Sequence, residues 1–279
     1  MLSYRHGFHA GNFADVLKHL VQVAILQYLK KKDAPIYYHD THAGAGTYAI
    51  AHSYMQKNRE YLDGINRLWL ARPTSRLLLD YLAIIQQLNP TDKLTTYPGS
   101  PEIAVRMLRH NDRIWLGELH TTDFRVLSEH YRRHPGVNCE MLDAWQGLKA
   151  KLPPKERRGL ILMDPSYELD SDYRQISKGM EDALQRFAQG IYAIWYPVID
   201  ERTTEKLLRR FAALSAQDNL HIRLHPGKGR LGMQACGMFI INPPYTLAET
   251  MKQTLPELLA LLGDDKRTSH FLVESLVNH

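Results

Sequence analysis

The chain has 279 residues, of which 44% are hydrophobic and 23% are charged, and its formal net charge is +5. This composition is that of a globular protein with one large domain, and the small positive excess favours a polyanionic partner without establishing one. The longest apolar runs are strand-sized, far below the roughly 20 residues of a membrane span, and the polar first dozen residues are unlike a signal peptide. Two isolated cysteines exclude a disulfide framework and a cysteine-based zinc site. We therefore expect a cytoplasmic protein with no membrane contact.

The order of elements along the chain predicts an α/β fold. Apolar spacing predicts a helix over 13–32, with Asn12 and Asp15 as its start signals. A short strand then runs into a glycine loop within IYYHDTHAGAG, residues 36–46. Alternating strands and helices indicate a largely parallel sheet with helices on both faces. Further strands are predicted at 113–120, 137–142, 159–164, 190–198, 220–225 and 236–242.

One interval is too long for a simple strand–helix–strand unit. Seventy positions (116 − 46) separate Gly46 from the next strand, whereas such a unit commonly needs about 30 residues. The segment PGSPEIAVRMLRH, residues 98–110, predicts the crossover helix itself, with Ser100 as N-cap and Pro101 at the first helical position. Residues 50–96 remain, and two stretches within them have helical patterns. We predict that they form an inserted helical subdomain.

The glycine loop DTHAGAG, residues 40–46, follows the first strand. Glycines allow a sharp turn and close approach of the backbone to a ligand. A dinucleotide-binding loop would have a third glycine where residues 47–49 are Thr, Tyr and Ala. The shorter form suits S-adenosylmethionine (SAM), which has no pyrophosphate. A purely structural turn is the alternative.

Acidic residues also end the next three predicted strands: Glu118, Asp143 and Asp164. Ligands of open α/β sheets bind at the carboxyl ends of the strands. There Glu118 can accept hydrogen bonds from ribose hydroxyls, and Asp143 can accept one from an adenine amine. Any one of them could be an exposed loop carboxylate, but three beside a glycine loop indicate a nucleoside-containing cofactor.

The sharpest signal is Asp164-Pro165-Ser166-Tyr167, just past the apolar strand. An exocyclic amine is a poor nucleophile because its lone pair is delocalised into the ring. An acidic side chain and the proline carbonyl can accept its two N–H bonds and move electron density onto the nitrogen. The aromatic residue can stack on an extruded base. The motif resembles the Asp/Asn-Pro-Pro-aromatic motif of nucleic-acid amino-methyltransferases, but Ser166 replaces the second proline and predicts a less rigid loop.

A second stretch, INPPY at 241–245, matches that motif more literally, with Asn242 and Tyr245. It follows the last predicted strand, which in this class runs antiparallel and points the other way. We therefore predict a turn at the sheet edge there and place the catalytic loop at Asp164.

Over nearly its full length the chain resembles the RlmJ family of bacterial 23S ribosomal RNA adenine-N6 methyltransferases. The matching pieces are LSYRHGFHAGNFADVLKH, DTHAGAG, YPGSP, GELH, DPSYE, IYAIWYP and GMFIINPP. The resemblance implies one class I SAM-dependent methyltransferase domain with a Rossmann-like sheet over 1–279, an N-terminal tail and helix at 1–35 and the insertion at 50–96. It implies direct in-line methyl transfer from SAM to an adenine N6 amine, with no metal.

The resemblance also implies roles for individual residues. Asp164 is the expected catalytic acceptor. Tyr4 and His6 are expected on a tail that closes over cofactor and target base, with Tyr167 as the stacking residue. The residues expected to bind SAM are Lys18, His19, His42, Gly44, Ser100, Glu118, Asp143, Ala144 and Asp164.

Three other functions were weighed against these patterns. DNA adenine-N6 methylation uses the same motif, and without the whole-chain resemblance the residues do not separate RNA from DNA. A noncatalytic RNA-binding module would explain the charge but not the strand-end carboxylates. A metal-dependent hydrolase could draw on the histidines near Asp40, but no HExxH pattern is present. The expected partner is 23S rRNA, either naked or in an assembling particle, and a monomer is expected.

Overall fold

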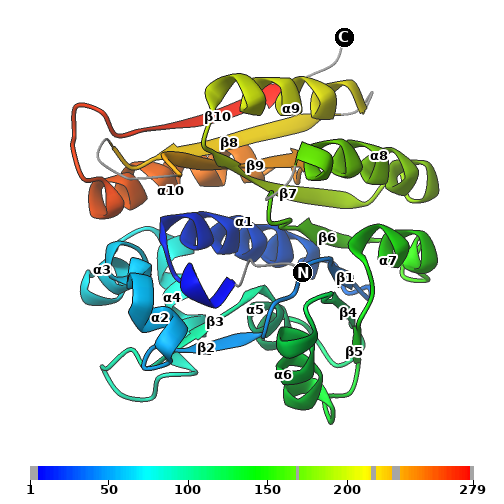
Figure 1. Ribbon diagram of the computed structural model, residues 1–279, viewed down its shortest axis with the longest axis horizontal. Helices are drawn as coiled ribbons and strands as arrows, with labels where there is room; N and C mark the ends of the chain where they lie inside the picture. The colour runs from blue at the N-terminus through cyan, green and yellow to red at the C-terminus, as the bar shows by residue number, and fades with distance from the viewer. Residues whose placement is uncertain (1–5, 168–169, 215–217, 228–232, 277–279) are drawn as a thin grey trace.

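The computed structural model of the chain describes residues 6–167, 170–214, 218–227 and 233–276 (Figure 1). Its helices are η1 (His6–Phe8), α1 (Phe13–Lys30), α2 (Ser53–Asn58), η2 (Glu60–Asp63), α3 (Ile65–Leu70), α4 (Arg76–Gln86), α5 (Ser100–Met107), α6 (Thr121–Tyr131), α7 (Ala144–Lys151), α8 (Asp170–Arg186), α9 (Glu201–Leu214) and α10 (Leu247–Leu262). Its strands are β1 (Tyr37–Asp40), β2 (Thr47–Ala49), β3 (Thr96–Pro98), β4 (Arg113–Gly117), β5 (Val137–Glu140), β6 (Gly159–Met163), β7 (Ile191–Val198), β8 (Asn219–His225), β9 (Ala235–Ile241) and β10 (His270–Leu276).

The central sheet has eight strands in the order β10-β8-β9-β7-β6-β1-β4-β5. β5, β4, β1, β6 and β7 are parallel, whereas β9 runs antiparallel between β7 and β8. From β1 the chain builds the sheet first toward β4 and β5 and later toward β6 and β7. The strand order therefore reverses between β1 and β6, the position at which open α/β sheets bind ligands.

Two apolar cores cover the sheet, one on each face. Side chains of α1, α5, α6 and α10 pack on one face, and those of α7, α8 and α9 pack on the other. In β6 the side chains alternate between the cores, with Leu160 and Leu162 on the first face and Ile161 and Met163 on the second. Every residue of β6 is buried, which explains its continuous apolar sequence. The prediction of a sheet with helices on both faces is confirmed.

The predicted strands are confirmed with ends that differ by at most three residues, and α1 begins after Asn12 as expected. The Asn12 side chain accepts hydrogen bonds from the backbone N–H groups of Ala14 and Asp15, both at 2.9 Å. Such a cap satisfies amide groups that have no partner within the helix. Among the described residues, no helix combines the length and apolar character needed to cross a bilayer.

The inserted segment leaves and rejoins the sheet at one point. β2 and β3 form a two-stranded antiparallel ribbon that joins its two ends, and the Gly99 N–H donates to the Gly46 carbonyl at 2.8 Å. The glycine loop is thus followed in space by α5, although more than fifty residues intervene in sequence. Helices α2, η2, α3 and α4 lie between these ends, and their apolar side chains share the core of α1 and α10 (Figure 1).

Three details differ from the sequence predictions. Gly99, not Ser100, is the N-cap of α5, because the Ser100 hydroxyl donates instead to Asp40 Oδ2 at 2.6 Å. β10 was not predicted, so β9 is neither the last strand of the chain nor an edge strand. The INPPY turn therefore follows an interior strand. The Asn242 amide donates to the Ala188 and Gly190 carbonyls near the start of β7, at the opposite end of the sheet from Asp164.

Candidate active site

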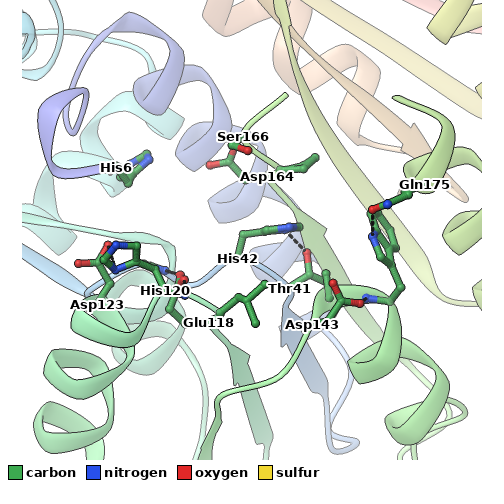
Figure 2. A pocket seen from close by; sticks show the side chains of 15 residues that line it. His6, Thr41, His42, Glu118, His120, Asp123, Asp143, Asp164, Ser166 and Gln175 are labelled. Carbon is green, nitrogen blue, oxygen red and sulfur yellow. Dashed lines mark hydrogen bonds and ion pairs between the residues drawn. The ribbon is translucent and has the colours of Figure 1, made fainter. Parts of the chain in front are cut away.

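A pocket of about 210 Å³ opens where β1, β4, β5 and β6 end, and we call it the strand-end pocket. Figure 2 shows Asp164 and Ser166 on one side of it, with His42 between them and the carboxylates of Glu118 and Asp143. Its lining residues are His6, Thr41, His42, Gly44, Glu118, Leu119, His120, Asp123, Asp143, Ala144, Trp145, Asp164, Pro165, Ser166 and Gln175. The three strand-end acids and the glycine loop are thus brought to one cavity.

The glycine loop is held from below by Asp40. The Asp40 carboxylate accepts from the hydroxyls of Ser100 and Tyr38, at 2.6 and 2.9 Å, and from the His42 N–H at 3.2 Å. Burial raises the pKa of Asp40, while these donors lower it in part. Gly44 has φ +60°, and a Cβ there would lie 2.3 Å from the Tyr48 hydroxyl oxygen. Both backbone conformation and space therefore require glycine at this position.

Backbone groups orient the two acids at the ends of β4 and β5. Glu118 accepts from the N–H groups of Gly44, at 2.8 Å, and His120, at 2.7 Å, one on each carboxylate oxygen. Burial raises the pKa of Glu118 above its usual value, although these two amides act in the opposite direction. Asp143 caps α7 by accepting from the Trp145 N–H at 3.0 Å. Each carboxylate keeps lone pairs that can accept from a nucleoside.

A second cavity, of about 430 Å³, lies on the other side of Asp164, and we call it the adjoining pocket. Residues of α1, the inserted segment and β7 form most of its wall, including Lys18, Glu60 and Trp195. Three residues line both cavities: His6, Asp164 and Ser166. A group bound in one pocket would meet a group bound in the other beside the Asp164 carboxylate.

A chain of buried charges runs from the N-terminal segment to that carboxylate. His6 Nε2 lies 2.9 Å from Asp15 Oδ2, Asp15 Oδ1 lies 2.8 Å from Lys18 Nζ, and Lys18 Nζ donates to Asp164 Oδ2. The side chains of Lys18, Asp15 and Asp164 are only 4%, 2% and 12% exposed. Burial acts to lower the pKa of Lys18, but the two carboxylates raise it above its usual value. The lysine therefore stays protonated and holds Asp164 in one orientation.

The same residues bear on the hydrolase alternative. Ligand atoms of His6, Asp15 and Asp164 lie within 4.8 Å of one another, the one such group found in the described part of the chain. The Lys18 ammonium contacts both carboxylates of this group. A cation would have to displace it. The charges of the cluster are thus balanced by the protein itself.

Two residues expected at the cofactor, His19 and Ser100, lie behind the strand-end pocket rather than in its lining. His19 is fully buried, and its Nδ1 lies 2.8 Å from the Tyr97 hydroxyl. Its other nitrogen, Nε2, has no hydrogen-bond partner within the described residues. Buried polar atoms are seldom left without partners, so this nitrogen fits a site completed by a polar ligand such as SAM.

The aromatic residues of the site differ from expectation. Tyr167 is buried, and its hydroxyl donates to the Trp195 carbonyl at 2.6 Å, so its ring lines neither pocket. Its φ of +54° sets this inward direction. The stacking surface predicted for Tyr167 is therefore absent in this conformation, and Trp195 is the aromatic side chain that faces the adjoining pocket. Tyr4 lies outside the described residues, whereas His6 lies at the junction of the pockets as expected.

Several lining residues were missed by sequence reasoning. Asp15 was read only as a helix-start signal, and His120, Asp123, Trp145 and Gln175 were not singled out. His120 and Asp123 follow the β4 strand end directly, so extending the strand-end argument by five residues would have found them. No local pattern marks Gln175 or Trp145, because a contact between α7 and α8 brings them to the pocket.

The sheet order, the glycine loop after β1 and the acids after β4, β5 and β6 together define a class I SAM-dependent methyltransferase. SAM is the methyl donor of this class. The residues around the strand-end pocket fit it, because carboxylates face its nucleoside-sized space and a glycine turn forms its floor.

Relatives of known name identify the family within this class. A sequence profile described as "Ribosomal RNA large subunit methyltransferase D, RlmJ" matches residues 33–277. The chain is 44% identical over 260 residues to ribosomal RNA large subunit methyltransferase J of Escherichia coli (strain K12), covering 92% of this chain and 93% of that protein. It is also 44% identical over 265 residues to the protein of that name from Haemophilus influenzae, covering 94% of each.

A solved structure agrees with the sequence relatives. The crystal structure of a Legionella pneumophila protein matches with a TM-score of 0.89 and 39% identity, over 96% of this chain and 98% of that one. The chain therefore belongs to the RlmJ family of ribosomal RNA large subunit methyltransferases.

Proposed function

We propose that this enzyme methylates the exocyclic N6 amine of an adenine in 23S ribosomal RNA, with SAM in the strand-end pocket and the adenine in the adjoining pocket. The observation that carries this proposal is that the two cavities meet at Asp164, His6 and Ser166. SAM supplies the methyl group when it is bound. The adenine must leave its stack to reach a site this enclosed, which is easiest in looped or single-stranded RNA.

The chain's own residues prepare the amine for transfer. Lys18 engages Oδ2 of Asp164, which leaves Oδ1 to accept one N–H bond of the amine. Acceptance of that bond, with the Pro165 carbonyl as second acceptor, raises electron density on nitrogen as the methyl group approaches. Transfer is then direct and in line, without a covalent enzyme intermediate or a metal. The six residues expected at SAM that line the strand-end pocket keep that role here: His42, Gly44, Glu118, Asp143, Ala144 and Asp164.

His6 and Trp195 shape the space for the base. His6 lies at the boundary of the two pockets and is held by Asp15 at 2.9 Å. The Trp195 ring offers the stacking surface that the motif assigned to Tyr167, because Tyr167 packs against it from inside with ring centroids 6.0 Å apart. Stacking on an aromatic ring holds an unpaired base without reading its sequence.

The test is a transfer assay with methyl-labelled SAM and two separate acceptors, unmodified 23S rRNA and adenine-containing DNA. We expect label in RNA, recovered as N6-methyladenine. The Asp164→Ala variant should lose at least about 100-fold in rate, as when one preorganised electrostatic group is removed from an active site. The Asp164→Asn variant should keep more activity, since its carbonyl can still accept the amine.

The outcomes separate the possibilities. Label only in DNA would retain the chemistry and overturn the substrate. Label in RNA at another position would overturn the assignment of the adenine amine. Comparing naked 23S rRNA with assembling particles, and measuring mass in solution, would test the expected free-RNA acceptor and monomeric state.

A further inference from the structure

Residues 6–12 are enclosed between the inserted segment and the active site. In Figure 1 the dark blue turn that precedes α1 lies beside α2 of the cyan insertion. Phe8 contacts Tyr54 of α2 with ring centroids 4.7 Å apart, and Lys57 Nζ lies 5.1 Å from the centre of the Phe8 ring. The insertion thus provides the outer surface on which the N-terminal segment rests.

Glu60 makes the polar part of this contact. Its carboxylate oxygens lie 2.9 and 3.0 Å from His9 Nδ1, and Oε2 also accepts from Asn12 Nδ2 at 2.9 Å. The hydrogen bond from Glu60 is the largest cause that raises the pKa of His9, which favours the charged pair. Arg59, with φ +53°, turns the chain between α2 and η2 immediately before Glu60. A non-glycine residue in this conformation is uncommon and marks a position fixed by its surroundings.

Backbone contacts complete the attachment. The Ile65 N–H donates to the Gly11 carbonyl at 2.8 Å. A Cβ on Gly64 would lie 2.1 Å from that same carbonyl oxygen, so the two segments are as close as a glycine allows. Gly11 itself has φ +78°, which directs the chain into α1. One residue of side chain at Gly64 would separate the insertion from the N-terminal segment.

The far side of the N-terminal segment faces the reacting groups. His6 lines both pockets and contacts Asp15, which in turn holds Lys18 and, through it, Asp164. The His9 N–H donates to the His6 carbonyl at 2.8 Å, so His6 and His9 belong to one turn. Whatever fixes His9 therefore also fixes His6.

We infer that the helical insertion positions the active site, and that Glu60 is the positioning residue through which it holds His6 between the two pockets. This inference rests on the proposed function, since it assigns His6 to the junction of cofactor and base. The inserted helices then serve the chemical step and not only contact with RNA. Loss of the Glu60 contact should slow transfer at saturating RNA and SAM, because small misplacements of reacting groups reduce rates steeply.

The experiment compares Glu60→Gln with Glu257→Gln in the full chain. Glu257 is a matched control, because it accepts from the N–H groups of Thr74 and Ser75 and ties the insertion to α10 away from the site. We expect Glu60→Gln to lower kcat about 10- to 100-fold, with the SAM dissociation constant and the KM for RNA within about twofold of wild type. Glu257→Gln should leave kcat unchanged. Amide exchange over residues 6–12 should accelerate in Glu60→Gln alone.

A double-mutant cycle with His9→Asn makes the reasoning specific. If Glu60 acts through His9, the double variant should be no slower than the slower single variant. Additive losses would overturn the inference. So would a raised KM for RNA with unchanged kcat, because Glu60 also lines the adjoining pocket and could meet RNA directly. Amide exchange is read without RNA, so unchanged exchange would refute the inference even if the wild-type enzyme proved inactive on 23S rRNA and the proposed function failed.

Discussion

Replacing Lys18 with methionine tests the buried charge network most directly. Methionine preserves most of the volume and removes the ammonium that lies 2.8 Å from Asp15 Oδ1 and also contacts Asp164. Two carboxylates, each at most 12% exposed, would then face one another with His6 as the remaining neighbour able to carry positive charge. Removing one partner of a buried ion pair costs about 3–5 kcal/mol, because the other charge is left without compensation.

That loss should appear as a fall of the midpoint of thermal unfolding by about 10 °C, given a shift of about 2–4 °C per kcal/mol in a chain of this size. The matched control is Lys30→Met, since Lys30 belongs to the same helix but is exposed at its end. Its midpoint should stay within about 2 °C of wild type. Transfer activity should fall in Lys18→Met as well, because nothing then fixes the Asp164 carboxylate.

The pH dependence gives the sign of the effect. The pKa of Asp15 is low in the folded protein despite burial, because His6 and Lys18 lower it, and the pKa of Lys18 is raised. Stability from the lowered carboxyl pKa is present above about pH 4, and that from the raised lysine pKa is present below about pH 10. The variant should therefore be most destabilised between these values. The difference should shrink in acid, where its carboxylates take up a proton. Equal midpoints of Lys18→Met and Lys30→Met at pH 7 would refute this reasoning.

Three further predictions concern the pockets and the core. Glu118→Gln should weaken SAM binding roughly 10- to 100-fold by calorimetry, because a charged acceptor contributes about 1.5–3 kcal/mol and an amide has one acceptor oxygen where Glu118 uses two; an unchanged dissociation constant would remove Glu118 from the cofactor site. Trp195→Leu should raise the KM for RNA between about 5- and 100-fold with SAM binding retained, the range expected for loss of about 1–3 kcal/mol of base stacking; unchanged RNA kinetics would contradict its role in the adjoining pocket. Burial lowers the pKa of His19 and His39 to about 3 and that of His221 to about 4. Because these histidines are neutral when folded and protonate when unfolded, stability should fall as pH drops below about 6.5, by about 4 kcal/mol per pH unit near pH 5. Urea titrations from pH 7.5 to 4.5 would measure the slope, and a flat profile would show that these histidines titrate normally.

The amino-acid sequence by itself determined the features that depend on neighbours along the chain. The buried strands, the start of α1 after Asn12 and the glycine loop after β1 each follow from residue type and short-range spacing. Asp164 could be placed at a strand end because a fully buried strand precedes it directly. The pocket could be predicted because parallel strands bring their carboxyl ends to one edge of a sheet.

Only the tertiary structure decided how distant residues meet. Asp15 and Lys18 are three residues apart on α1, but their partner Asp164 lies 146 positions beyond Lys18. The inward turn of Tyr167 depends on the Trp195 carbonyl, and β10 exists as a strand because β8 offers it an open edge. The contact of Glu60 with His9 spans 51 positions. Periodicity and capping report on a residue's own helix or strand. They carry no information about which remote side chain completes a hydrogen bond, since that depends on how the whole chain packs.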